Sequence, residues 1–127
     1  MKDFDMLFDQ NPVFAALSED KKQLIKKQGI SKRFSKGELI AMDGDTWPYM
    51  FIITKGSVHA LKSSLEGRSL VVTTFNEGDI FWGLAFFYEQ MPMPVSLEAA
   101  VNTSIMLWSA ESLVPVLKCE GAAAWEL

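Results

Sequence analysis

The stretch Gly78-Asp79-Ile80-Phe81-Trp82-Gly83-Leu84-Ala85-Phe86-Phe87 decides how this chain is interpreted, together with the run Met93-Pro94-Val95-Ser96 that follows it. It opens with the composition of a tight turn, in which glycine and aspartate are favoured. The residues after the turn are apolar and aromatic. No arginine occurs from Gly78 to Leu127, so this part of the chain has no guanidinium with which to bind a phosphate group.

Turns of the same kind punctuate the chain before this stretch. They are Lys36-Gly37, Asp43-Gly44-Asp45, Lys55-Gly56, Glu66-Gly67 and Glu77-Gly78-Asp79. The short β-rich runs between them predict an antiparallel sandwich or barrel, and their rhythm is typical of a jelly roll. The strongest predicted strands are Tyr49 to Thr54, Val58 to Lys62, Leu70 to Phe75 and Ser104 to Trp108. We therefore expect a mostly β fold.

Helical segments flank the predicted β-roll on both sides. Ser18 is a good N-cap, the acidic residues after it suit the positive end of a helix dipole, and Gly29 stops the helix. After Ser109 the pattern returns to a helix. We expect one domain over residues 1–119, with helices in 1–29, the β-roll in 30–109 and a helix in 110–119. Residues 120–127 are expected to begin a further helix.

Three more segments complete a resemblance to a known family. They are Phe34-Ser35-Lys36-Gly37-Glu38-Leu39-Ile40, Gly44-Asp45 and Met50-Phe51-Ile52-Ile53-Thr54-Lys55-Gly56-Ser57-Val58. With the stretch from Gly78 they resemble the cyclic-nucleotide-binding domain of the Crp/Fnr transcription regulators, over roughly residues 10–127. The resemblance implies a double-stranded β-helix, or jelly roll, with flanking helices. It also implies a sensor domain in transcription regulation, without enzymatic activity.

The chain departs from this family at the residues that hold the ligand. Members that bind cyclic nucleotides carry a Phe-Gly-Glu-Leu-Ala/Gly turn, whose glutamate accepts the ribose hydroxyl, and an Arg-Ser/Thr-Ala triplet, whose arginine neutralises the phosphate. Here Trp82 falls at the glycine, Gly83 at the glutamate and Leu84 at the leucine, followed by Ala85; Pro94 falls at the arginine, Val95 at the hydroxyl residue and Ser96 at the alanine. A phosphate placed there would lack its charge-assisted contact.

The resemblance nevertheless places an effector pocket at these positions. Its expected residues are Trp82, Gly83, Leu84, Ala85, Phe86, Phe87, Pro94, Val95 and Ser96. Aromatic and methionine side chains in and around this set suit an apolar or aromatic effector, with Trp47 and Tyr49 nearby. The alternative is that the same side chains close the pocket, which leaves a ligand-free jelly roll that serves as a structural or dimerisation module. Both interpretations stay open at this point.

Composition argues against several other kinds of site. The 127 residues carry a formal net charge of −4, which argues against nucleic-acid binding by this chain alone. His59 is the one histidine, so it cannot build a multi-histidine metal centre. We expect no cofactor; haem is the alternative that stays open, because a haem-binding sensor of this family could use His59 as a single axial ligand. Cys119 is the one cysteine, and a redox role for its thiol is the less favoured interpretation.

The resemblance also predicts partners. In the family a long helix after the β-roll pairs two subunits and leads into a DNA-binding domain, so we expect a homodimer through the helix that begins in 120–127. We expect no DNA-binding domain within these 127 residues, so the chain is either a fragment of a longer regulator or a free-standing effector domain. We expect DNA binding of a full-length regulator but not of this chain alone. The sequence shows no signal peptide and no apolar stretch near the roughly 20 residues that span a bilayer. We expect a cytoplasmic protein without membrane contact.

Overall fold

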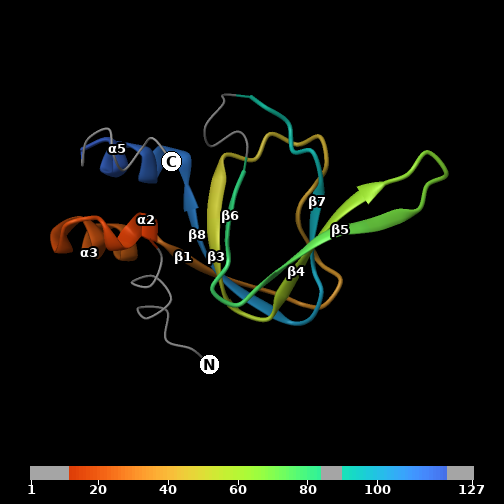
Figure 1. Cartoon of the computed structure of the whole chain (residues 1–127), viewed down its shortest axis with the longest axis horizontal. Helices are drawn as coiled ribbons and strands as arrows, with labels where there is room; N and C mark the ends of the chain where they lie inside the picture. The colour runs from red at the N-terminus through yellow and green to blue at the C-terminus, as the bar shows by residue number, and fades with distance from the viewer. Residues whose placement is uncertain (1–11, 84–89, 120–127) are drawn as a thin grey trace.

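A computed structural model describes residues 12–83 and 90–119, which form a β-roll with helices packed at one end (Figure 1). The helices are α2 (Pro12–Ala15), α3 (Glu19–Gln28) and α5 (Ala110–Cys119). The strands are β1 (Ile30–Phe34), β2 (Leu39–Ala41), β3 (Tyr49–Lys55), β4 (Ser57–Ser63), β5 (Ser69–Asn76), β6 (Ile80–Trp82), β7 (Ser96–Ala99) and β8 (Thr103–Ser109). None of the helices in these ranges is long and apolar enough to cross a membrane.

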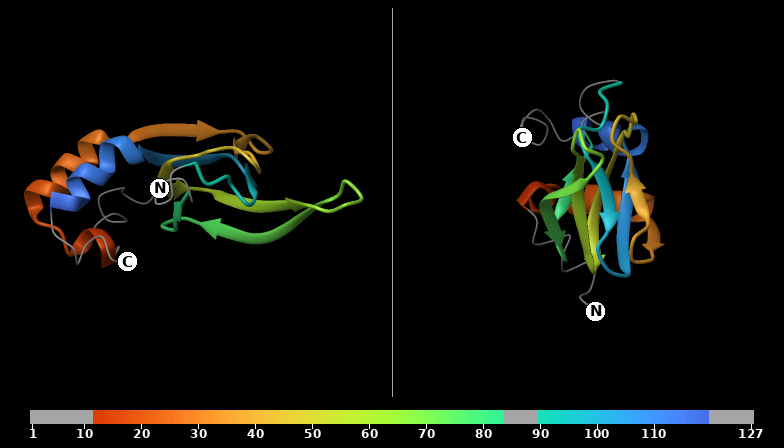
Figure 2. Two further views of the ribbon diagram at one scale, coloured as in Figure 1. Left: turned by 90° about the horizontal axis from the view of Figure 1, so that it is seen from above. Right: turned by 90° about the vertical axis from the view of Figure 1, so that its right-hand side faces the viewer.

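The strands form two four-stranded antiparallel sheets, in the orders β1-β8-β3-β6 and β2-β7-β4-β5. This arrangement confirms the predicted jelly roll, and the four strongest predicted strands are confirmed as β3, β4, β5 and β8. The β4–β5 hairpin extends from the body on the side away from the helices (Figure 2). The fold therefore has a helical end and a hairpin end.

Turn glycines set the spacing of these strands. Gly37, Gly56, Gly67 and Gly78 have φ angles of 89°, 94°, 80° and 87°. Positive φ values of this size are readily adopted only by glycine. The sequence prediction of tight reversals at these positions is therefore confirmed.

Alternate residues of β3 enter two separate apolar clusters. A helix-side cluster lies between the β1-β8-β3-β6 sheet and the helices, and consists of Phe14, Leu17, Ile25, Met50, Ile52, Trp108, Leu113 and Val116. An interior cluster lies between the sheets, and consists of Ala41, Phe51, Ile53, Val58, Ala60, Met93, Leu97, Ile105 and Leu107. Because β3 is covered on both faces, it reads as a continuous apolar run instead of an alternating one.

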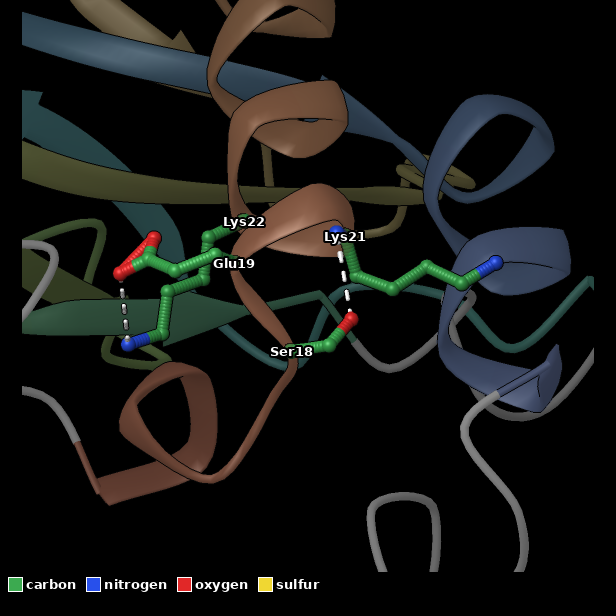
Figure 3. Close-up of polar contacts among 4 residues, drawn as sticks. All are labelled: Ser18, Glu19, Lys21 and Lys22. Carbon is green, nitrogen blue, oxygen red and sulfur yellow. Dashed lines mark hydrogen bonds and ion pairs between the residues drawn. The ribbon is translucent and has the colours of Figure 1, made fainter.

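The N-terminus of α3 is capped as the sequence predicts. The Ser18 hydroxyl accepts a hydrogen bond from the Lys21 N–H at 3.4 Å, and Glu19 pairs with Lys22 at 4.0 Å (Figure 3). At the other end, Gly29 has a φ of −68°, so the left-handed C-cap geometry common for glycine is not used here. Gly29 is needed for another reason: an added Cβ would lie 2.8 Å from Met106 Cε and 2.9 Å from the Trp108 ring.

Candidate effector site

Strand β6 runs into a glycine that is packed too closely to carry a side chain. Met50 of β3 pairs with Trp82, and the N–H of the buried Gly83 donates to the Tyr49 carbonyl at 2.8 Å. A Cβ on Gly83 would overlap the Trp47 carbonyl oxygen and lie 3.1 Å from that of Tyr49. Because these are backbone atoms, no change of rotamer relieves the overlap. A glutamate has no room at Gly83, the position to which the sequence resemblance assigns the ribose-binding glutamate.

Two members of the predicted pocket lie in different clusters. Trp82 packs against the helix-side cluster, whereas Val95 packs against the interior cluster. The structure therefore does not bring these two side chains together in one volume. Leu84, Ala85, Phe86 and Phe87 lie outside the described residues, so the pocket as a set stays a prediction.

The segment Pro94-Val95-Ser96, which the sequence resemblance aligns with a phosphate-binding triplet, already has polar partners within the chain. The Ser96 hydroxyl accepts the Asp43 N–H at 2.9 Å, which ties β7 to the turn after β2. The Pro94 carbonyl accepts a hydrogen bond from Lys62 Nζ at 2.9 Å. Sequence reasoning missed this lysine, because it is distant in sequence and only the pairing of β4 with β7 brings it here. Lys62 is an exposed cation beside the triplet, although it lacks the forked donors of arginine.

Aromatic rings fill much of the space between the sheets. The Trp47 ring lies 5.9 Å from Phe51 and 6.2 Å from Phe81, measured between ring centroids. Phe51 and Phe81 are stacked at 5.7 Å, and Phe75 meets Phe81 edge-on at 5.5 Å. Contacts of this geometry stabilise a core by more than the burial of area alone.

An apolar cavity of about 320 Å³ lies beside these rings, toward β1. Its lining residues are Ile30, Lys32, Phe34, Ile40, Trp47, Tyr49, Ile105 and Leu107. Ile30 is 56% exposed, so the cavity opens to solvent at the β1 edge. Lys32 is the one charged residue of the lining, and Tyr49 supplies a hydroxyl. Trp47 and Tyr49 were predicted near the effector pocket, whereas the role of β1 in the lining was not predicted.

A family model described as "Cyclic nucleotide-binding domain" matches residues 31–118, which is most of the chain. The chain belongs to this family. The match spans all the strands from β1 to β8 and most of α5. The family is a regulatory ligand-binding domain, in agreement with the resemblance seen in the sequence.

Proteins similar to this cyclic nucleotide-binding domain include a kinase regulatory subunit by sequence and the sensor domain of a transcription regulator by fold. A cAMP-dependent protein kinase regulatory subunit from Eremothecium gossypii is 30% identical over 113 residues, which are 89% of this chain and 23% of that protein. The chain thus spans about a quarter of this relative. The sensor domain of the transcriptional regulator DNR from Pseudomonas aeruginosa is similar in structure, with a TM-score of 0.83 at 18% identity. The similar region covers 96% of this chain and 81% of the DNR sensor domain.

A third relative shows that this fold also occurs in proteins described as independent of cAMP. The regulatory subunit of a cAMP-independent protein kinase A from Trypanosoma brucei has a TM-score of 0.75 at 20% identity, and covers 91% of this chain and 44% of that one. A form of that protein with three substitutions is described as bound to cAMP. Membership of the fold therefore does not fix the ligand.

Histidine and cysteine contribute no recognisable centre to the described part of this domain. His59 lies on β4 between Thr74 and Glu98 in the register of the sheet. Within residues 12–83 and 90–119, no group of three or more histidine, cysteine, aspartate or glutamate residues is placed to hold a metal ion. The Cys119 side chain lies outside the described residues. Any role of His59 toward haem or of Cys119 in redox sensing stays a prediction.

Proposed function

We propose that this chain is the effector-sensing domain of a Crp/Fnr-like transcription regulator, and that it binds an apolar or aromatic effector instead of a cyclic nucleotide. The observation that supports an apolar effector is the cavity of about 320 Å³ beside Trp47 and Tyr49. Small-molecule sites begin at roughly 300 Å³ and combine apolar walls with a few polar groups. The domain has a sensory role and no catalytic one.

The lining of this cavity suggests the chemistry of the effector. Trp47 and Tyr49 offer ring faces, Ile30, Ile40 and Leu107 offer aliphatic walls, and the remaining members are Lys32, Phe34 and Ile105. Lys32 is the one group there that can neutralise a charge. A flat aromatic acid fits this set, because its ring meets apolar surface while its carboxylate meets the ammonium group.

Two features argue against a cyclic nucleotide at the family's usual position. Backbone oxygens of Trp47 and Tyr49 occupy the space that a glutamate at Gly83 would need. Pro94 replaces the arginine, and its carbonyl is bound by Lys62. The cAMP-independent relative from Trypanosoma brucei supports the idea that this fold functions with other ligands or with none.

A thermal-shift titration tests the proposal with cAMP, cGMP, haem and a panel of aromatic acids. A ligand that binds only the native state raises the melting temperature. At a ligand concentration of 100 Kd, it increases the free energy of unfolding by about 2.7 kcal/mol. We expect an aromatic acid to raise Tm by several degrees, and the rise to shrink in Lys32→Gln. Lys27→Gln on the exposed face of α3 is the matched control. Stabilisation by cyclic AMP that disappears in Lys62→Gln would contradict the proposal.

A ligand-free structural module is the second candidate, and the ring contacts between the sheets favour it. Phe51, Phe75 and Phe81 already occupy the roll interior, as a collapsed pocket would require. In that case no compound of the panel raises Tm. The module would serve dimerisation through the helix expected in residues 120–127, which lie outside the described residues.

Partner and location follow from the same proposal. A Crp/Fnr-like regulator acts on DNA in the cytoplasm as a homodimer, and effector binding biases the position of its dimerisation helix only through a difference in affinity between two states. The acidic chain by itself is not expected to bind a specific DNA sequence.

A further inference from the structure

A second cavity, of about 430 Å³, lies where β1 leads into its following turn and β8 begins. Its lining residues are Arg33, Phe34, Ser35, Lys55, Asn102, Thr103 and Ser104. We call it the cationic pocket, because two of these residues carry positive charge and none carries negative charge. It shares Phe34 with the apolar cavity and shares no residue with the effector pocket predicted from the sequence.

The two cations flank a hydroxyl in one row of the sheet. Arg33 on β1 pairs with Ser104 on β8, and Ser104 pairs on its other side with Lys55 on β3. Residues directly opposite each other in antiparallel strands project on the same face, with Cβ atoms about 5 Å apart. The register of β3 and β8 is irregular between Ile53 and Lys55, but Arg33 and Lys55 line the same cavity as Ser104.

Neither cation is neutralised in the part of the chain that the structure describes. The ion pair there joins Lys22 and Glu19 on α3, and it involves neither Arg33 nor Lys55. The Glu38 carboxylate contacts the lining residue Ser35, where it accepts a hydrogen bond from the backbone N–H at 2.7 Å. Two like charges without counter-ions repel each other, so an anion between them would relieve the repulsion.

The other polar groups of the pocket are mainly donors. Asn102 Oδ1 accepts the Lys36 N–H at 3.0 Å, which leaves the amide NH₂ of Asn102 to donate. The Thr103 hydroxyl is engaged with the Ser57 carbonyl at 3.0 Å and the Val101 carbonyl at 2.8 Å. The hydroxyls of Ser35 and Ser104 add two rotatable donors. Such a set matches a multiply charged oxyanion better than a neutral ligand.

We infer that the cationic pocket binds the phosphate group of a small phosphorylated metabolite. A dianionic phosphate matches both cations, whereas a carboxylate would leave one of them without a counter-charge. Its oxygens can also accept from Asn102 and Ser104. The volume leaves room for an organic part beside Phe34. The site stands apart from the proposed effector function, so either can fail without the other.

Amide NMR tests the site with inorganic pyrophosphate and ribose 5-phosphate as probes, against sodium chloride at matched ionic strength. We expect saturable shifts at Ser35, Asn102 and Ser104 with both phosphates and none with chloride. Arg33→Gln and Lys55→Gln should each raise Kd about tenfold, which corresponds to about 1.4 kcal/mol. Both cations are exposed, so Tm without ligand should stay the same or rise slightly as the repulsion is removed, and Lys27→Gln is the control.

Three results would overturn the site. The first is a set of shifts that grow linearly without saturation, or that chloride reproduces. The second is an unchanged Kd in the double variant Arg33→Gln with Lys55→Gln. The third is saturable binding whose shifts map to β7 and Lys62 instead of β8. If pyrophosphate binds and ribose 5-phosphate does not, the pocket accepts free phosphates and the inferred organic part is wrong.

Discussion

Gly83→Ala is expected to lower the free energy of unfolding by about 1–3 kcal/mol, the range typical of overpacking in a well-packed interior. The added Cβ would overlap the Trp47 carbonyl oxygen, and this atom belongs to a rigid backbone segment. Tyr49 N–H donates to that same oxygen at 2.9 Å, and Gly83 N–H donates to the Tyr49 carbonyl at 2.8 Å. Relief of the overlap must therefore stretch at least one of these bonds. Thermal unfolding measures the loss, as a fall in Tm of roughly 4 °C per kcal/mol.

Gly83→Glu should destabilise the domain further, because a carboxylate would be forced toward backbone carbonyls in a buried position. Pro94→Arg is the matched control, since Pro94 is exposed and tolerates a longer side chain. If Gly83→Glu unfolds at the temperature of the parent chain, the contact between β6 and Trp47 is not as close as described.

The same variants test the proposal that this domain does not bind a cyclic nucleotide. The double variant Gly83→Glu with Pro94→Arg restores both family residues in sequence, yet we expect no stabilisation by cyclic AMP, because the glutamate cannot take its position. The Trypanosoma brucei relative is described as cAMP-bound after three substitutions. Cyclic AMP binding by the double variant would mean that side chains alone, and not the backbone around Gly83, decide the ligand here.

The β-roll could be predicted because its signals are local. The turns between β1 and β6 carry Gly37, Gly44, Gly56, Gly67 and Gly78, all with positive φ, and β3 and β8 are strongly apolar. The face that Trp82 occupies could not be predicted in the same way. β6 has three residues, which is too short to display an alternation, and neighbouring aromatic residues on such a strand point to opposite faces. The pairing with Met50 places Trp82 toward the helices.

The proposed binding surfaces depend on contacts between distant residues, which no local pattern shows. In the sequence, Arg33 belongs to a lysine-rich run that is most simply interpreted as a solvated surface. Its pocket arises only because β8 lies between β1 and β3 and brings Lys55 and Ser104 beside it. Likewise, Lys62 reaches Pro94 through the pairing of β4 with β7. Gly29 was correctly predicted to end α3, but its φ is not left-handed, and a side chain there would be too close to Met106 and the Trp108 ring.

Trp108→Ala is expected to lower the free energy of unfolding by about 3–5 kcal/mol, which is typical of removing a large buried aromatic side chain. Trp108 is fully buried in the helix-side cluster, and its indole N–H donates to the Ile25 carbonyl of α3 at 2.7 Å. It therefore joins the sheet to the helices both by packing and by a hydrogen bond.

Trp108→Phe separates these two contributions. It keeps an aromatic ring beside Phe14, which lies 6.5 Å from Trp108 between centroids, but it removes the donor to Ile25. We expect a loss of about 1–3 kcal/mol, between the parent and Trp108→Ala. Urea unfolding measures all three proteins, and Trp82→Ala provides the half-buried comparison with a smaller loss. Equal losses in the alanine and phenylalanine variants would mean that the phenyl ring retains none of the stabilisation, and that the hydrogen bond and the outer part of the indole provide all of it. A loss below 1 kcal/mol in Trp108→Ala would mean that α3 is held to the sheet by other contacts, because the ring packed beneath Gly29 would then be dispensable.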